Sequence, residues 1–251
     1  MYLLPKPKTI KEQDGQMLLC HSTHIVMTKE VAETEMHAAK RLQEAIRQET
    51  GLILPFSVGE VREGDLSLGI AKTLPEQTYE ITIDEKGGQI SGGDGAGVLY
   101  GVETFCQIVQ QCGGILPCVQ IQDAPDMPNR GYYFDQTRGR VLKLEKLKKI
   151  ADRMSRYKLN QLQLYVEHTY LFRDFSEMWR DQTPLTAEEI RELDSYCRER
   201  HIELVPSLAS FGHLCTLLST KTYGDLCEME DSWKEPFSFW NRMRYHTINV
   251  S

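Results

Sequence analysis

Hydrophobic positions in the first 120 residues alternate between helical and strand periods. Apolar residues spaced three and four apart, followed by Gly51 in a C-cap position, predict a helix over about residues 33–50. Leu66–Ile70 is a candidate strand, and Tyr79–Ile83 alternates apolar with polar residues as a half-buried strand does. This pattern is typical of a small α/β domain in which a helix covers a sheet.

A glycine-rich segment, Ser91–Gly97, precedes a second predicted helix that begins near Val98. Such a turn at a helix N-terminus could hold a phosphate. However, it lacks the Lys-Ser/Thr of a P-loop, and no acidic residue lies at the distance expected for ribose binding. We therefore expect a tight turn that allows close packing of the helix.

The segment Gln122–Asn129 has the composition of a linker. It holds two prolines within four positions together with polar turn-forming residues. We expect a domain boundary there, which divides the chain into an N-terminal α/β domain over residues 1–125 and a second domain over residues 126–251.

Beyond the linker, short strands alternate with amphipathic helices. The predicted strands are Gly131–Phe134, Asn160–Tyr165 and Ile202–Val205, the last ended by Pro206. A helical period follows the first strand, and Thr186–Glu189 forms a capping box before the next helix. Successive strand–helix units imply a parallel sheet, either doubly wound or closed into a barrel.

Composition limits the classes of function. The 251 residues are 41% hydrophobic and carry a net charge of −7, which argues against a nucleic-acid partner. No run of 18 apolar residues predicts a membrane span, and no secretory signal is visible, so we expect a cytoplasmic protein. The seven cysteines are scattered as reduced thiols would be, and Cys20, His21 and His24 are too few to predict a metal site.

Polar residues concentrate where the three strands of the second domain end. Asp135 and Arg138 follow the first strand, and Glu167 and His168 follow the second. The third leads to His213, which is preceded by a glycine. Because the carboxyl ends of parallel strands meet at one rim, these groups are expected to converge into a site. Two alternatives stay open: Asp135 and Arg138 simply pair with each other or with the neighbouring strand, or the histidines are structural.

These residues resemble glycoside hydrolase family 20, the β-N-acetylhexosaminidases. The resemblance spans nearly the whole chain and rests on five motifs in family order: Tyr79–Ile83, Gly97–Thr104, Arg130–Arg138, Lys158–Tyr165 with Leu185–Ile190, and Ile202–His213. It implies a small N-terminal α/β domain followed by a (β/α)₈ TIM-type barrel, of which this chain contains the first three to four units.

The resemblance also implies an activity, the removal of terminal β-linked N-acetylhexosamine by a substrate-assisted retaining mechanism. The partner is then a carbohydrate, and neither an organic cofactor nor a metal is required. Carried over by position, Arg130 would bind sugar hydroxyls, and His213 with Glu167 would tune the general acid. Asp135 and His168 are candidate supporting residues, the latter because the turn after the second strand departs from the family pattern.

One feature of the family is not found in the second half of the chain. The family's catalytic Asp-Glu pair follows the fourth barrel strand, whereas the one Asp-Glu dipeptide here, Asp84-Glu85, lies in the N-terminal domain. Residues 130–251 amount to about half of the roughly 250 that a barrel needs. We therefore expect an N-terminal portion of a longer enzyme.

Several alternatives stay open. They are a non-catalytic carbohydrate-binding or assembly protein that keeps a half-barrel, a homo-oligomer that covers its edge, and a family 84 hexosaminidase. The D-x-x-R of Asp135–Arg138 and the Gly-His loop fit family 20 better than family 84. The preference between GlcNAc and GalNAc is left open.

Overall fold

The structure is a computed structural model that describes the chain except for residues 232–233, 235–237, 241–246 and 251. It divides into two compact units. The first contains Met1–Arg130 together with Asp152–Asn160 and Glu199–Ile202, and the second contains the remaining residues.

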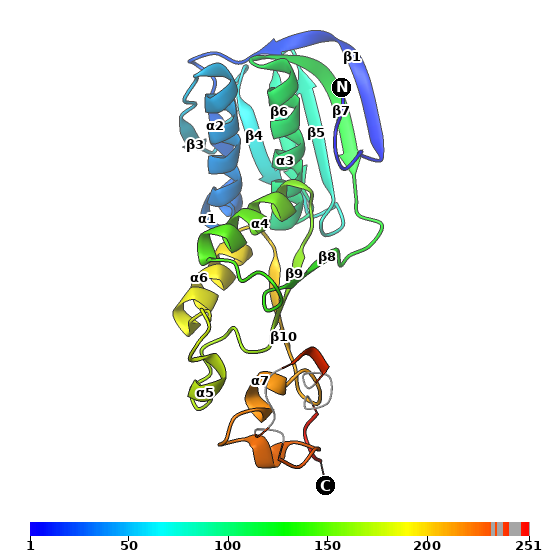
Figure 1. The fold of residues 1–251 in the computed structure, drawn as a ribbon. Coiled ribbons are helices and arrows are strands. Elements are labelled where there is room, and N and C mark those ends of the chain that lie inside the picture. Colours follow the sequence, from blue (N-terminus) through cyan, green and yellow to red (C-terminus); the bar gives the residue numbers. More distant parts are fainter. Residues whose placement is uncertain (232–233, 235–237, 241–246, 251) are drawn as a thin grey trace. The chain divides into compact units, whose positions relative to one another are not determined.

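The first unit is built on a seven-stranded sheet with the order β1-β7-β5-β6-β4-β2-β3 (Figure 1). Its strands are β1 (Thr9–Leu18), β2 (Ile25–Met27), β3 (Phe56–Val58), β4 (Leu66–Ile70), β5 (Tyr79–Asp84), β6 (Gly87–Gly92) and β7 (Ile115–Asp123). β1, β7, β5 and β6 pair antiparallel, whereas β6, β4, β2 and β3 pair parallel. The sheet is therefore mixed, and the predicted strands β4 and β5 are confirmed.

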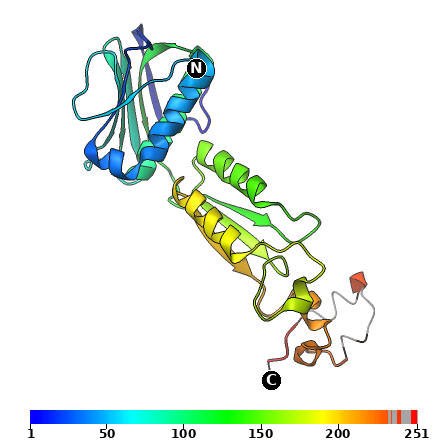
Figure 2. The ribbon, with the colours of Figure 1, turned by 90° about the vertical axis from the view of Figure 1, so that its left-hand side faces the viewer.

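Helices cover one face of this sheet. They are α1 (Lys29–Thr34), α2 (Met36–Thr50) and α3 (Gly95–Cys112), and α2 and α3 lie side by side along the sheet (Figure 2). The apolar faces of α2 and α3 pack with the sheet into one continuous core. The helix predicted over about residues 33–50 is confirmed as α2, which begins at Met36 because Glu35 has a non-helical backbone with φ −121° and separates α2 from the short α1.

The glycine-rich turn serves packing, as the sequence predicts. Asp94 caps α3, and its Oδ1 accepts a hydrogen bond of 2.7 Å from the Gly97 N–H. A carboxylate thus occupies the helix N-terminus at which a phosphate would bind. A Cβ on Gly97 would lie 2.2 Å from the Thr78 carbonyl oxygen, and one on Gly93 would lie 1.9 Å from that of Pro75. These glycines therefore allow the helix and its preceding loops to approach closely.

The second unit contains a three-stranded parallel sheet with the order β10-β9-β8. Its strands are β8 (Gly131–Asp135), β9 (Gln161–Val166) and β10 (Glu203–Leu208). The connections contain α4 (Leu144–Arg156), which from Asp152 onward belongs to the first unit, α5 (Ser176–Trp179) and α6 (Ala187–Arg198). The helix α7 (Cys215–Leu218) and the 3₁₀ helix η1 (Gly224–Leu226) follow β10. Sequential strands are neighbours in the sheet, as expected for successive strand–helix units.

Two local predictions, a capping box before α6 and the end of a strand at Pro206, can be compared with the structure. The capping box is confirmed, since Thr186 N donates to Glu189 Oε2 at 2.9 Å and Glu189 N donates to Thr186 Oγ1 at 3.2 Å. The prediction that Pro206 ends the strand is wrong, because β10 continues to Leu208. Among the described strands β10 pairs with β9 alone, and its parallel register with β9 continues through Pro206 to Leu208.

Within the residues that the structure describes, no helix is long and apolar enough to cross a membrane. Five of the seven cysteines are buried, consistent with small core residues: Cys106, Cys118, Cys197, Cys215 and Cys227.

Candidate functional site

The parallel register of the second unit brings the strand ends level. Asp135, the last residue of β8, pairs in register with Tyr165 of β9, and Tyr165 pairs with Ser207 of β10. The residues that follow each strand therefore emerge at one edge of the sheet. The convergence of Asp135, Glu167, His168 and His213 predicted from the sequence is what the structure shows.

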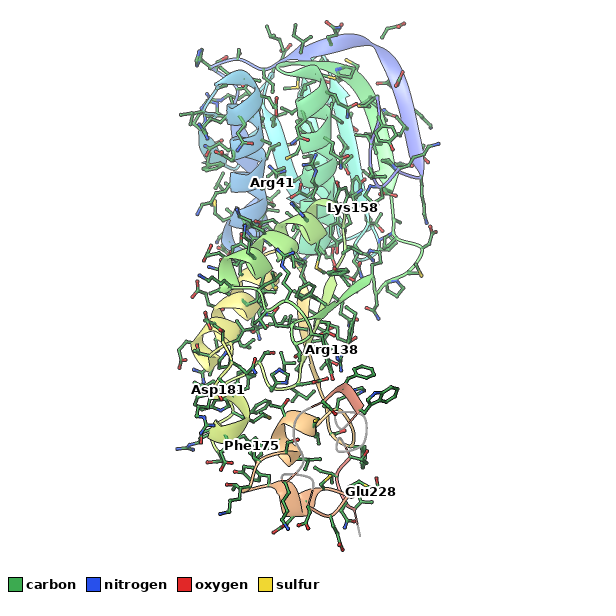
Figure 3. All side chains as sticks on the ribbon, in the orientation of Figure 1. Arg41, Arg138, Lys158, Phe175, Asp181 and Glu228 are labelled. Atoms are coloured by element: carbon green, nitrogen blue, oxygen red, sulfur yellow. The ribbon has the colours of Figure 1, made fainter. Side chains whose placement is uncertain are left out.

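Arg138 is the centre of this cluster (labelled in Figure 3). Its Nη1 donates to Asp135 Oδ2 at 2.9 Å, and its Nη2 contacts Glu167 Oε1, Tyr165 Oη at 3.3 Å and His213 Nδ1 at 3.1 Å. The guanidinium carbon also lies 5.1 Å from the centre of the Tyr165 ring. One cation thus links groups from all three strand ends.

Glu167 is the buried carboxylate of the cluster, with a side chain that is only 5% exposed. Its Oε1 accepts a hydrogen bond of 2.6 Å from the Tyr165 hydroxyl in addition to the contact with Arg138. Its backbone N–H donates to Thr137 Oγ1 at 2.9 Å. A buried carboxylate needs such compensation, because burial without partners strongly disfavours its charge.

The two histidines differ in exposure. His168 has a 14% exposed side chain, and its Nδ1 lies 3.7 Å from Glu167 Oε2 and 3.3 Å from Thr216 Oγ1. His213 is 62% exposed and has a backbone φ of 62°, a region that few residues other than glycine adopt. A cavity of about 450 Å³ adjoins the cluster and is lined by Thr137, Arg138, Gly139, His168, Gln182, Thr216 and Ser219.

Asp135 orients Arg138 through both its backbone and its side chain. Burial disfavours the Asp135 carboxylate, but hydrogen bonds from the N–H groups of Arg138 and Thr137 and from the Arg138 guanidinium outweigh it, so the pKa of Asp135 lies below its ordinary value. Asp135 and Arg138 therefore do pair with each other, and because Arg138 also contacts Tyr165, Glu167 and His213, the pair belongs to the larger cluster.

Arg130 does not join the cluster, which corrects its predicted place in the site. It precedes β8, whereas Asp135 ends that strand, so about 16 Å of extended chain separates them. The Arg130 guanidinium donates to the carbonyl oxygens of Met127, Pro128 and Lys158 at 2.7, 3.0 and 2.8 Å, and to the Tyr100 hydroxyl at 3.0 Å. These acceptors all belong to the first unit, where Arg130 has a structural role.

Sequence reasoning placed Arg138 at the rim but assigned the sugar-binding role to Arg130, and it assigned no role to Tyr165. Arg138 was visible as the last residue of the D-x-x-R spacing. Tyr165 and Glu167 are two residues apart at the end of a strand, a spacing that places side chains on the same face. Those two spacings are enough to predict that Arg138 and Tyr165 both contribute to the site.

The side chains of the cluster are suited to binding a ligand and to handling a proton. It combines a fixed carboxylate, an exposed imidazole and a half-exposed guanidinium, which suits the binding of an oxygen-rich neutral ligand and the transfer or orientation of a proton. Of the donors on Arg138, Nε–H and one Nη1–H have no acceptor among the described residues. In the same described part of the chain, no group of three or more metal-ligating side chains is found.

Tyr165 should make the stability of the protein depend on pH in the alkaline range. Burial and the adjacent Glu167 raise the pKa of Tyr165 from 10.0 to about 12. The unfolded chain therefore loses this proton first, and stability should fall as pH rises through that interval. Tyr165→Phe is expected to lower the urea midpoint at pH 8, because Glu167 loses a donor, yet to make its decline between pH 10 and 12 shallower.

The matched control for that experiment is Tyr132→Phe, since the Tyr132 side chain is 44% exposed. This control should follow the wild-type decline. An alkaline slope that is equal in both variants would contradict the role given to the buried Tyr165 hydroxyl.

Comparisons with known proteins agree on one group of enzymes. Residues 1–124 match the family model described as glycosyl hydrolase family 20, domain 2. The chain is 26% identical over 245 residues to a beta-hexosaminidase of Porphyromonas gingivalis, covering 86% of this chain and 31% of that protein. It is 27% identical over 238 residues to a beta-hexosaminidase of Vibrio furnissii, covering 84% and 38%. The chain thus spans about a third of the length of the curated relatives it matches.

Solved structures show the same fold. A GH20 exo beta-N-acetylglucosaminidase from Vibrio harveyi, in complex with N-acetylglucosamine, matches 98% of this chain with a TM-score of 0.79 at 20% identity, and 42% of that chain is covered. A Streptomyces plicatus beta-hexosaminidase in complex with GlcNAc matches 86% with a TM-score of 0.75 at 22% identity, and 47% of that chain is covered. The similarity therefore extends past the N-terminal unit into the part that holds the cluster.

Proposed function

Because the chain belongs to glycoside hydrolase family 20, we propose that it forms part of an exo-β-N-acetylhexosaminidase that removes terminal β-linked GlcNAc or GalNAc from a carbohydrate. The observation that carries the proposal is the convergence of Arg138, Glu167, His168 and His213 at the ends of three consecutive parallel strands. Such a rim is where a barrel enzyme assembles its site.

The proposal includes the fold. β8, β9 and β10 would be the first three strands of a (β/α)₈ barrel, and the remaining strands would lie outside these 251 residues. The parallel order of the three strands supports this, as does the similarity to full-length family structures of which the chain covers less than half.

The proposed reaction is substrate-assisted. The 2-acetamido oxygen of the substrate attacks C1 while the glycosidic oxygen departs and takes a proton from a carboxylic acid. Water then opens the oxazolinium ring and returns a proton to that carboxylate, so the sugar leaves with its configuration retained. The acid would belong to an Asp-Glu pair outside this chain, since residues 130–251 contain no such dipeptide.

Within this chain, Arg138 would take the sugar-binding role that the resemblance gave to Arg130. Arg138 is half-exposed beside the cavity, and two of its N–H donors have no acceptor among the described residues. A planar guanidinium suits neighbouring sugar hydroxyls because it presents several donors in fixed directions. Asp135 and Glu167 would hold it in place.

The test compares two forms of the protein on an aryl N-acetyl-β-glucosaminide and the corresponding galactosaminide. We expect negligible release of the aryl alcohol by the 251-residue chain and clear turnover by a form that continues past Ser251. Rapid turnover by the 251 residues alone would overturn the placement of the acid. An extended form inactive on both substrates would reject the hydrolase and favour the non-catalytic carbohydrate-binding alternative.

A further inference from the structure

A cavity of about 220 Å³ in the first unit shares no residue with the Arg138 cluster or with the cavity beside it. Every residue that lines it belongs to the first unit. One water molecule needs only about 15 Å³ of such space, so the cavity can admit a larger molecule. The reaction proposed above makes no use of this cavity.

Three hydrogen-bond donors on its lining have no acceptor among the described residues. The oxygen of Tyr100, a residue that is 2% exposed, accepts from Arg130 Nη2 at 3.0 Å, which leaves its own hydroxyl hydrogen over. Arg130 uses four of its five N–H groups, on that oxygen and on three carbonyls. Lys158 (labelled in Figure 3) uses two of its three, on Tyr79 Oη at 2.7 Å and Asp123 Oδ2 at 3.1 Å. Because a buried donor without an acceptor costs free energy, this lining favours a ligand that accepts.

The lining also has more positive than negative charge. Four cationic side chains and two carboxylates line the cavity. The carboxylates, Asp123 and Asp126, each pair with one lysine, at 3.1 and 2.7 Å. Lys6 and Arg130 have no carboxylate partner among the described residues, although the chain as a whole carries a net charge of −7. A negatively charged ligand would balance these two cations.

The rest of the lining is largely apolar. Prolines, an alanine and a methionine contribute aliphatic surface, and three tyrosines contribute rings. Binding sites for small molecules typically combine such walls with a few convergent polar groups. We propose that this cavity binds a small carboxylate that carries an apolar body. The carboxylate oxygens would accept from Tyr100 and Arg130, whose donor atoms are 3.0 Å apart, while Lys158 supplies further positive charge.

Two simpler ligands are the alternatives. A bare inorganic anion would satisfy the donors but leave the aliphatic and aromatic walls in contact with water. A neutral aromatic molecule would cover the walls but leave the positive charge unbalanced. Benzoate, inorganic phosphate and benzyl alcohol therefore separate the three cases, because benzoate alone combines the charge with the ring.

Titration of the ¹⁵N-labelled 251-residue chain with benzoate at constant ionic strength tests the proposal. We expect saturable shifts of the backbone amide signals of Tyr100, Met127 and Arg130, and at least about tenfold weaker binding of phosphate and of benzyl alcohol. The absence of saturable shifts with benzoate would overturn the proposal. Equal affinity for benzyl alcohol would show that the charge is not recognised, and equal affinity for phosphate that the body is not, so either result would reject it.

A conservative variant tests the buried donor. Tyr100→Phe removes the hydroxyl but keeps the ring, and it should weaken benzoate binding about tenfold because a charged acceptor loses a hydrogen bond. Tyr2→Phe makes the same change on a residue that is 76% exposed and lies outside the lining, so its affinity should equal that of the wild type. Equal affinity in the two variants would overturn the proposal.

A second pair of variants changes exposed lysines and so keeps the test independent of folding. Lys6→Gln removes a cation of the lining and should weaken benzoate binding about two- to fivefold, the effect of one exposed charge. Lys11→Gln, at an exposed position of β1 outside the lining, should leave it unchanged. Equal weakening by both would mean that benzoate responds only to the overall charge of the chain, which would contradict a site in this cavity. None of these measurements needs turnover, so their outcome is independent of the hydrolase assay.

Discussion

Replacing Arg138 by lysine is expected to lower kcat/KM of the proposed extended hydrolase about 100-fold while changing stability little. Lysine keeps the positive charge beside Glu167 but loses the planar set of donors. Hydrogen bonds from charged donors contribute about 1.5–3 kcal/mol each, which corresponds to roughly 10- to 100-fold in binding of the transition state. Hydrolysis of the aryl N-acetyl-β-glucosaminide and the urea midpoint of the same variant provide the two measurements.

Arg130→Lys is the matched control, because it makes the same chemical change at the other arginine. The Arg130 guanidinium donates to three carbonyl oxygens and one hydroxyl within the first unit. One ammonium group has three donors and cannot reach all four acceptors in their separate directions. We expect a loss of stability of about 1–3 kcal/mol with kcat/KM within a few-fold of wild type.

The reverse result would contradict this division of roles. If Arg130→Lys lost activity at unchanged stability and Arg138→Lys kept it, the sugar-binding role would return to Arg130. If both variants lost both activity and stability, binding could not be assigned to one arginine and stability to the other.

The position of the site was predictable because strand direction is readable from the sequence. Alternating and helical periods separate β8, β9 and β10 from their helices, and in a parallel sheet the carboxyl ends share an edge. The choice between the two arginines was not settled by that reasoning. Both flank β8, and only the one at its carboxyl end can reach Glu167 and His213.

Other features depend on packing that periodicity does not record. The interruption at Glu35 between α1 and α2 occurs without proline or glycine, so no local breaker marks it. The continuation of β10 through Pro206 depends on its pairing with β9, which is set by the sheet and not by the local sequence. The burial of Glu167 likewise follows from three strand ends meeting, because the apolar run Leu164–Val166 ends just before it and does not by itself predict a buried carboxylate.

For the glycine-rich turn, the composition alone predicts the packing role that the structure shows, and the contribution of this packing to stability can be measured. Gly97→Ala is expected to destabilise the first unit by about 3–5 kcal/mol, because its Cβ would lie 2.2 Å from the Thr78 carbonyl oxygen. The neighbour is backbone, so relief requires the loop before β5 or the start of α3 to move. The gain in helix propensity from alanine, about 1 kcal/mol, is too small to offset that displacement.

Gly114→Ala is the control for that prediction, since the nearest atom to its Cβ is 3.6 Å away, an ordinary van der Waals distance. Its urea midpoint should lie close to that of the wild type, whereas that of Gly97→Ala should fall well below both. A Gly97→Ala variant as stable as Gly114→Ala would show that the turn can move to accept a side chain. Close packing would then not explain the glycines, and phosphate binding would again be a candidate role for the turn. In that event inorganic phosphate should raise the midpoint of the wild type, a shift that the Asp94 carboxylate at the helix N-terminus leads us not to expect.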